Sequence, residues 1–177
     1  MNITRFLLLI QNKLSTTHSE SDDRYILTST LCHNKHTLDV GCKYGAGVPW
    51  IGKYAKSLVL TDLEDQRWPE ILHYRFIETD FTKDEAFDDS EFECVVMLEI
   101  LEHVKKPEKL INHVYRILEK GGTFIFSTPC VERDIETHIK PFFTKEEVLG
   151  LIDPAKFKIN FLIKHLDVSW FGMMEKK

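Results

Sequence analysis

The fold is decided by the stretch Leu38-Asp39-Val40-Gly41-Cys42-Lys43-Tyr44-Gly45-Ala46-Gly47. An apolar strand that runs into a glycine-rich turn and then a helix is typical of nucleotide binding, because glycine lets the backbone approach a ligand and adopt positive φ. The glycines are spaced G-x-x-x-G-x-G, which differs from the dinucleotide fingerprint G-x-G-x-x-G. No Gly-Lys-Ser/Thr follows, so a Walker phosphate loop is not predicted either. An ordinary tight turn remains the alternative for this loop taken alone.

Short apolar runs on both sides of this stretch predict further strands. Each run is bounded by polar residues or by Gly and Pro, as buried parallel strands are. The predicted strands cover residues 37–40, 58–60, 76–77, 94–98, 123–126 and, late in the chain, 158–165. The alternation of these runs with helical segments indicates an α/β domain with a mainly parallel sheet.

Three helices are predicted between these strands. The clearest covers residues 107–118, with Pro107 at its first position and a C-terminal stop signal at Gly121-Gly122. A second covers residues 46–55. The third begins after Thr144, a predicted N-cap, and runs to about Ile152. The polar segment 15–23 is expected to form a loop after a short N-terminal helix.

Polar side chains follow three of the predicted strands. Ligands of parallel α/β sheets bind at the carboxyl ends of the strands, so these side chains are candidate ligands. Asp62 ends the second strand, where a carboxylate accepts hydrogen bonds from ribose hydroxyls or stays a solvated loop acid. Asp80 ends the third strand and either contacts an adenine amino group or caps the following turn. A cluster from Glu99 to Val104 follows the fourth strand.

Together, these segments resemble the class I S-adenosylmethionine-dependent methyltransferases over residues 35–152. The motifs are Leu-Asp-Val-Gly-Cys at residues 38–42, Asp62, Asp80, the stretch 95–104 and Leu-Glu-Lys-Gly-Gly at residues 118–122. The resemblance implies a Rossmann-like, doubly wound sheet in the order 3-2-1-4-5-7-6, with one antiparallel strand near the C-terminal edge. It also implies S-adenosylmethionine as cofactor, bound by Asp39, Gly41, Cys42, Lys43, Gly45, Asp62, Leu63, Asp80, Phe81, Leu98 and Glu99.

Lys43 departs from the family pattern, which usually has a second glycine at this position. Its ammonium group either holds the methionine carboxylate of the cofactor or points to solvent. Because Gly41 and Gly45 remain, the turn is still expected to form.

The candidate catalytic residues are Glu102, His103 and His138. An oxygen acceptor needs a base or a metal, and a histidine titrates near neutral pH. A structural helix turn is the alternative for Glu102 and His103, and a plain surface histidine is the alternative for His138. With Glu99, these residues also resemble the metal site of small-RNA 3′-terminal 2′-O-methyltransferases. Metal-free members share the pattern, and no metal is expected.

Composition restricts the class of partner. The chain has 177 residues, of which 43% are hydrophobic and 29% charged, and its formal net charge is −5. An acidic chain is not expected to bind nucleic acid. The four cysteines lack Cys-x-x-Cys spacing, which favours reduced thiols in the cytoplasm over a zinc site. The apolar run 6–10 is too short for a membrane span.

The length predicts a single methyltransferase domain over residues 1–177. It would comprise an N-terminal helical segment (1–31), the cofactor-binding core (35–152) and an edge strand with a tail (153–177). The segments that select the acceptor in this fold are short here. We therefore expect an open pocket for a small-molecule, glycan or carrier-bound acceptor, or one completed by a homodimer mate or a partner subunit. A non-catalytic partner protein with the same fold is the remaining hypothesis.

Overall fold

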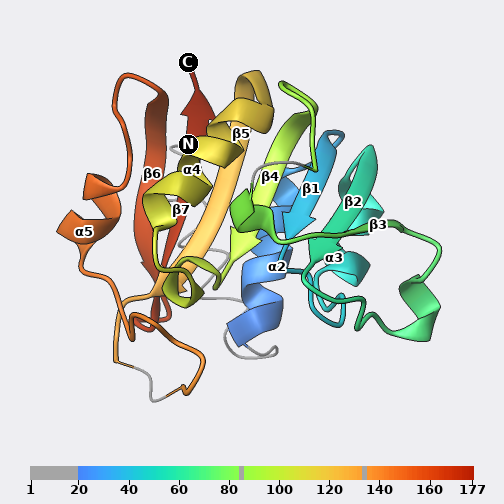
Figure 1. Cartoon of the computed structure of the whole chain (residues 1–177), viewed down its shortest axis with the longest axis horizontal. Helices are drawn as coiled ribbons and strands as arrows, with labels where there is room; N and C mark the ends of the chain where they lie inside the picture. Colours follow the sequence, from blue (N-terminus) through green and yellow to red (C-terminus); the bar gives the residue numbers. More distant parts are fainter. Residues whose placement is uncertain (1–19, 84–85, 133–134) are drawn as a thin grey trace.

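The computed structural model describes residues 20–83, 86–132 and 135–177 of the chain. A seven-stranded sheet forms its centre, with helices packed on both faces (Figure 1). The elements are α2 (Glu20–Leu31), β1 (His36–Val40), α3 (Val48–Tyr54), β2 (Ser57–Asp62), η1 (Pro69–Ile71), β3 (Arg75–Glu78), η2 (Phe81–Lys83), β4 (Phe92–Leu98), η3 (Leu101–His103), α4 (Pro107–Ile117), β5 (Leu118–Pro129), α5 (Lys145–Gly150), β6 (Phe157–His165) and β7 (Ser169–Lys176).

The strand order is β3-β2-β1-β4-β5-β7-β6, which confirms the predicted order. β1 pairs in parallel with β2 and β4, β2 with β3, and β4 with β5. β7 runs antiparallel to both β5 and β6. The order reverses direction at β1, so the carboxyl ends of β1 and β4 border the crevice in which ligands of such sheets bind.

Alternate residues of the central strands pack into different hydrophobic clusters, one on each face of the sheet. Leu38 and Val40 of β1 lie in the cluster that contains the apolar residues of α4 and α5. Leu58 and Leu60 of β2 lie in the cluster that contains those of α2 and α3. Side chains alternate between the two faces of a strand, so a strand covered by helices on both sides is apolar at most of its positions. This explains why the strands were predictable as continuous apolar runs.

α5 begins as the sequence predicts. The Thr144 hydroxyl accepts a hydrogen bond from the backbone N–H of Glu147, and the Glu147 carboxylate accepts one from the N–H of Thr144. This capping box satisfies two N–H groups that a helix end leaves unpaired. The helix ends at Gly150, two residues before the expected end.

The end of α4 differs from the prediction. The helix stops at Ile117, and Leu118 is already extended, with φ −74° and ψ 140°. Leu118 pairs with Phe92, and the register then shifts so that Thr123 pairs with Cys94. Gly121, with φ 77°, therefore lies in a bulge of β5 rather than at the helix end. The glycine pair marks a strand irregularity, which only glycine accommodates readily at positive φ.

One further expectation needs correction. Residues 20–23 belong to α2 and not to a loop. The acidic residues in that first turn favour a helix N-terminus. The tail forms β7, which lies between β5 and β6 as the predicted order requires, so that β6 is the edge strand. The expected N-terminal helix around residues 6–10 lies outside the described residues.

The structure also bears on membrane-spanning helices and on the state of the cysteines. Among them, no helix combines the length and the apolar character that a membrane crossing requires. Each of the four cysteines is a thiol and not half of a disulfide.

Candidate functional site

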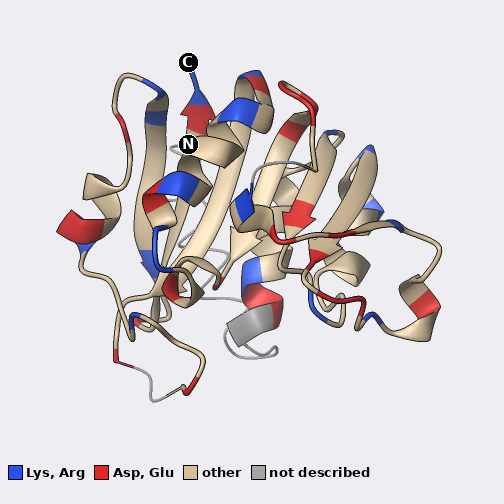
Figure 2. Ribbon diagram, in the orientation of Figure 1, with Lys and Arg blue, Asp and Glu red and all other residues tan. Residues whose placement is uncertain are grey.

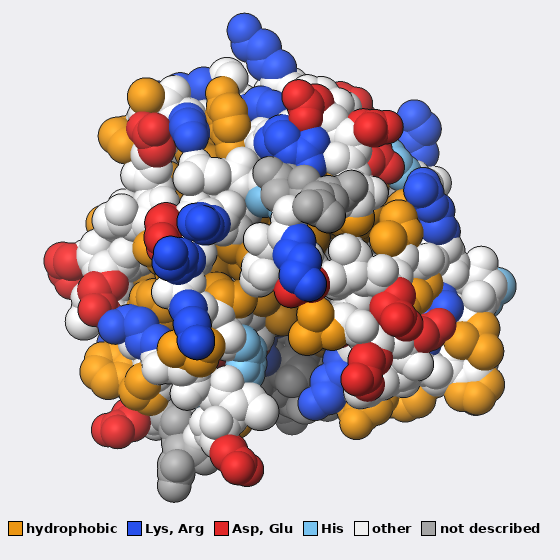
Figure 3. Space-filling model, in the orientation of Figure 1, with side chains coloured by type: hydrophobic (Ala, Val, Ile, Leu, Met, Phe, Trp, Pro, Cys, Tyr) orange, Lys and Arg blue, Asp and Glu red, His pale blue; other side chains and the backbone are white. Residues whose placement is uncertain are grey.

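A cavity of about 1400 Å³ lies at the carboxyl ends of the strands. It exceeds the roughly 300–1,000 Å³ of a typical ligand pocket, so it has room for two molecules. The residues that line it come from α2, the loops after β1 to β4, η3, the start of α4 and the loop before α5. Figure 3 shows apolar side chains exposed in a hollow on this side of α4, bordered by Lys and Arg.

The glycine-rich turn forms one wall of this cavity. Gly41 has φ 74°, and a Cβ atom there would collide with the side chain of Ile100. Only glycine allows this close approach between the loops that follow β1 and β4. Lys43 also lies in the left-handed region, with φ 47°, which explains why glycine suits this position. Its Nζ lies 5.2 Å from the centroid of the Tyr44 ring.

Asp62 joins the ends of β1 and β2. Its Oδ2 accepts a hydrogen bond of 2.7 Å from the Lys43 N–H, and its Oδ1 accepts one of 2.7 Å from the Leu63 N–H. Each carboxylate oxygen has two lone pairs, so both retain one for a ligand hydroxyl. The side chain lines the cavity, as its sequence position predicts.

Asp39 is the most perturbed acid of the site. It is 3% exposed, and no hydrogen-bond donor reaches its Oδ2. Burial, with the negative charge of Asp62 as a lesser cause, raises the pKa of Asp39 to about 7. Shifts of this size are concentrated at functional sites, because burial and charge are arranged there for a task.

Asp80 and Glu99 line the cavity at the ends of β3 and β4. Oδ1 of Asp80 accepts hydrogen bonds from the N–H and the hydroxyl of Thr82, which lower the pKa of the carboxyl group. Asp80 therefore caps the turn that follows β3, and its side chain also lines the cavity. Glu99 accepts a 2.7 Å hydrogen bond from the Ser127 hydroxyl and has φ 57°, an uncommon conformation for a residue with a Cβ atom.

Glu102, His103 and His138 come together at the other end of the cavity, although 35 residues separate the two histidines in the sequence. One ligand atom from each of the three lies within 4.8 Å of the others. The Glu102 carboxylate is fully buried and accepts a hydrogen bond from the Thr128 hydroxyl. The Glu102 carbonyl accepts hydrogen bonds from the N–H groups of Ile139 and Lys140, which hold the loop of His138 in place.

The orientation of the His103 ring is fixed. Its Nδ1 lies 3.0 Å from the Thr137 carbonyl oxygen, which is only an acceptor, so Nδ1 carries the hydrogen. In the neutral ring, Nε2 then presents a lone pair. The His138 ring packs edge-on against it, with 4.8 Å between the ring centroids.

Most of the predicted site residues line one cavity. All three candidate catalytic residues do so, as do Gly41, Lys43, Asp62, Leu63, Asp80, Phe81, Leu98 and Glu99. Asp39, Cys42 and Gly45 do not line it and pack behind the loop instead. Asp39 lies against Gly47, and Gly45 leaves no space for a Cβ atom beside Ile71.

Sequence reasoning missed Arg24, on α2. This side chain lines the cavity while its residue is only 6% exposed, and its buried Nη1 has no hydrogen-bond partner. An unpartnered guanidinium N–H at the cavity wall is a site for a ligand carboxylate. A polar segment before the first strand gives no signal that one of its cations will be buried.

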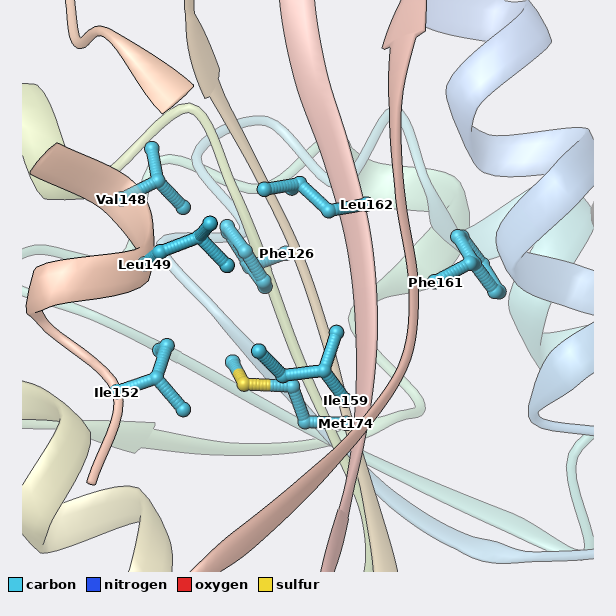
Figure 4. Close-up of a pocket in the computed structure, with 8 residues that line it drawn as sticks. All are labelled: Phe126, Val148, Leu149, Ile152, Ile159, Phe161, Leu162 and Met174. Atoms are coloured by element: carbon cyan, nitrogen blue, oxygen red, sulfur yellow. The ribbon is translucent and has the colours of Figure 1, made fainter. Parts of the chain in front are cut away.

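A second pocket is apolar and holds about 10 Å³. Figure 4 shows Val148, Leu149 and Ile152 facing Ile159 and Met174 across it. This volume is about that of one water molecule, and the lining offers no polar partner, so the pocket is a packing gap between α5 and the sheet.

The sequence is similar to those of known methyltransferases. The model of a family described as "Methyltransferase domain" matches residues 16–155. The ubiquinone biosynthesis O-methyltransferase of Paracidovorax citrulli is 28% identical over 147 residues, which cover 76% of this chain and 60% of that protein. The chain spans about half to three fifths of the length of the curated relatives that it matches.

Solved structures show the same fold. The S-adenosylmethionine-dependent methyltransferase of Mesorhizobium loti superposes with a TM-score of 0.73 at 14% identity, over 89% of this chain and 100% of that one. The N-methyltransferase NodS of Bradyrhizobium japonicum, solved with S-adenosylhomocysteine, gives 0.68 at 16% identity, over 99% of both chains.

Proposed function

Because the chain belongs to this family of methyltransferase domains, we propose that it transfers a methyl group from S-adenosylmethionine to an oxygen or nitrogen atom. The proposed acceptor is a small molecule, a glycan or a carrier-bound intermediate. One observation carries this proposal: a single cavity is lined both by the acids Asp62 and Asp80, which lie at the ends of adjacent strands, and by a buried carboxylate with two histidines. The ubiquinone relative is an O-methyltransferase and NodS an N-methyltransferase, so both acceptor atoms remain in the proposal.

The residues present fit the cofactor. Gly41 and Lys43 of the glycine-rich turn line the cavity, and the Asp62 oxygens each have a lone pair for a ribose hydroxyl. Asp80 faces the same space for the adenine, while Arg24 offers a buried guanidinium group for the methionine carboxylate. Arg24 suits this last role better than Lys43, whose ammonium group lies over Tyr44 at an exposed position.

The cofactor supplies an electrophilic methyl group on a sulfonium ion, and the chain supplies positioning and proton transfer. The Thr137 carbonyl holds His103 with Nε2 as the acceptor atom, so Nε2 takes the proton of the acceptor hydroxyl or amine. Glu102, buried against Thr128, holds the loop of His138 through its backbone and stabilises positive charge on the histidine pair.

Calorimetry with S-adenosylhomocysteine tests the cofactor site first. The wild-type protein is expected to bind it, and Arg24→Gln is expected to weaken binding at least tenfold, against an unchanged Kd for the control Arg75→Gln on an exposed strand end. Absence of binding at millimolar concentration would refute the enzyme and favour a non-catalytic partner protein.

Transfer itself is tested with a panel of hydroxylated and amine-bearing small molecules, with methylated product measured by mass spectrometry. His103→Gln is expected to lower the turnover about 10²–10⁴-fold without changing the Kd of S-adenosylhomocysteine. His73→Gln, at an exposed position outside the cavity, is the matched control. Equal turnover in both variants would show that His103 has no role in the transfer.

Metal-assisted methylation of an RNA 2′-hydroxyl is the second candidate function, because Glu102, His103 and His138 converge within 4.8 Å. A carboxylate and two imidazoles are a ligand set for a divalent ion, which would lower the pKa of an acceptor hydroxyl. Transfer to RNA that is lost in EDTA and restored by Mn²⁺ or Co²⁺ would favour this candidate over the proton transfer described above.

A further inference from the structure

Three lysines that follow His103 closely in the sequence line the same cavity. Lys105 and Lys106 follow η3, and Lys109 lies in the first turn of α4. Figure 2 shows blue segments on the loop that enters α4 and on the helix itself, and Figure 3 shows Lys and Arg side chains gathered on this side of the molecule. All three are exposed. The cavity therefore has a cationic wall next to its candidate base.

These lysines are not neutralised by the protein. In the described ranges, no carboxylate lies within 4.0 Å of their ammonium groups, whereas other cations such as Lys140 and Arg116 have ion pairs. Glu108, in the same turn, does not line the cavity. In a chain of net charge −5, three unpaired cations at one cavity wall are a local reversal of charge.

The position of these charges is also electrostatically unfavourable for the protein alone. They lie at the N-terminal end of an 11-residue helix, where the helix dipole is positive, no side chain accepts a capping hydrogen bond and a single acid, Glu108, accompanies the three cations. Like charges beside a positive helix end repel one another, and a bound anion would relieve this repulsion.

The acidic side chains Asp62, Asp80 and Glu99 lie at the ends of β2, β3 and β4, where the cofactor is proposed to bind. Lys105 and Lys106 follow the candidate base His103 by two and three residues, and the apolar side chains of Val104, Ile135 and Ile139 line the same cavity. The cation wall is therefore assigned to the acceptor, because it follows the candidate base along the chain.

From this arrangement we infer that the acceptor is a phosphate-bearing small molecule, whose phosphate group binds Lys105, Lys106 and Lys109. This inference rests on the proposed methyl transfer and names the substrate class of the same site. Lysine ammonium groups bind phosphate as point charges, and three of them match a dianion or diphosphate better than a single carboxylate. A long polyanion such as RNA is disfavoured, because the wall is local and the chain around it is acidic.

The test uses the full chain saturated with S-adenosylhomocysteine and titrated with inorganic pyrophosphate by calorimetry at low salt. The triple variant Lys105→Ala/Lys106→Ala/Lys109→Ala is expected to weaken pyrophosphate binding at least tenfold. The matched control Lys53→Ala/Lys56→Ala/Lys120→Ala removes the same charge from exposed positions outside the cavity and is expected to stay within twofold of wild type. Thermal melting of each variant verifies that it folds.

The outcomes separate this inference from the proposed function. Unchanged binding of S-adenosylhomocysteine with equal pyrophosphate affinity in wild type and triple variant would overturn the lysine site alone. An equal loss of pyrophosphate affinity in the control variant would also overturn the lysine site. So would malonate that binds as tightly as pyrophosphate. Lysine-dependent binding of a 12-nucleotide RNA more than tenfold tighter than pyrophosphate would replace the small acceptor with RNA. If the wild-type protein does not bind S-adenosylhomocysteine, the proposed function itself is refuted.

Discussion

Oδ2 of Asp62 lies 2.7 Å from the backbone nitrogen of Lys43, so the acid at the end of β2 holds the turn that follows β1. One carboxylate therefore serves two purposes. It fixes the backbone of the glycine-rich turn, and its remaining lone pairs face the cavity.

This relationship predicts that Asp62→Ala costs more than one ligand contact. Loss of the acceptor for the Lys43 N–H loosens the turn, so the Kd of S-adenosylhomocysteine is expected to rise at least tenfold and the free energy of unfolding to fall by about 1 kcal/mol. Calorimetry and urea denaturation measure the two effects. Glu119→Ala, at an exposed position on the β5 bulge, is the control. A change in affinity without any loss of stability would contradict the turn-holding role.

Lys43 itself is strained. A residue with a Cβ atom at φ 47° costs about 1 kcal/mol, which glycine avoids. Lys43→Gly is therefore expected to raise the free energy of unfolding by about 0.5–1 kcal/mol, while Lys43→Ala leaves it nearly unchanged. The opposite sign is expected for the control Lys53→Gly, within α3, by about 1 kcal/mol. Urea denaturation of the three variants measures these changes. A Lys43→Gly variant less stable than Lys43→Ala would contradict the strain at Lys43.

Asp39 predicts a pH dependence of stability. Its folded pKa of about 7 lies above the ordinary value of 3.8, so the folded state binds the proton more tightly than the unfolded state. Its contribution is complete below pH 4 and is lost as the pH rises to 7, by at most about 1.4 kcal/mol per pH unit. The stability of Asp39→Asn relative to wild type is therefore expected to increase over this range. Denaturation curves at several pH values measure it, and a constant difference would show that Asp39 is ionised throughout.

His165 gives the stability a pH dependence of the opposite sign to that of Asp39. Both ring nitrogens are buried without partners, and burial, with the charge of Arg24 as a lesser cause, lowers the pKa of His165 to about 4. Stability is therefore lost as the pH falls from 6.5 to 4, because the unfolded chain takes up the proton first, and it is unaffected by His165 above 6.5. His165→Leu is expected to remove this loss, and the exposed His73→Leu is expected to keep it. Parallel curves for the two variants would contradict the assignment.

The strands and the cavity wall could be predicted because local sequence determines them. Buried parallel strands are apolar at most of their positions, and Asp62, Asp80 and Glu99 lie where the strands end. The convergence of His103 and His138 followed from the family resemblance rather than from spacing, because α4 and β5 separate the two histidines in the sequence.

The remaining features depend on tertiary structure. Gly121-Gly122 is as good a helix stop as a strand bulge, and only the pairing of Leu118 with Phe92 decides between them. The burial of Arg24 depends on how α2 packs against the sheet, which a polar segment does not reveal. The place of β7 between β5 and β6 could be predicted from the family resemblance alone, because apolar periodicity cannot choose among distant strand pairings.

The position of β7 has a consequence for synthesis on the ribosome. β6 is translated before β7, yet within the sheet β6 contacts only β7. Until residues 169–176 have left the exit tunnel, the nascent chain has an open edge at β5 and an unpaired β6. Such exposed strand edges invite association with other chains. We expect a nascent chain stalled before residue 169 to bind holdase chaperones, and one released beyond β7 to let them go.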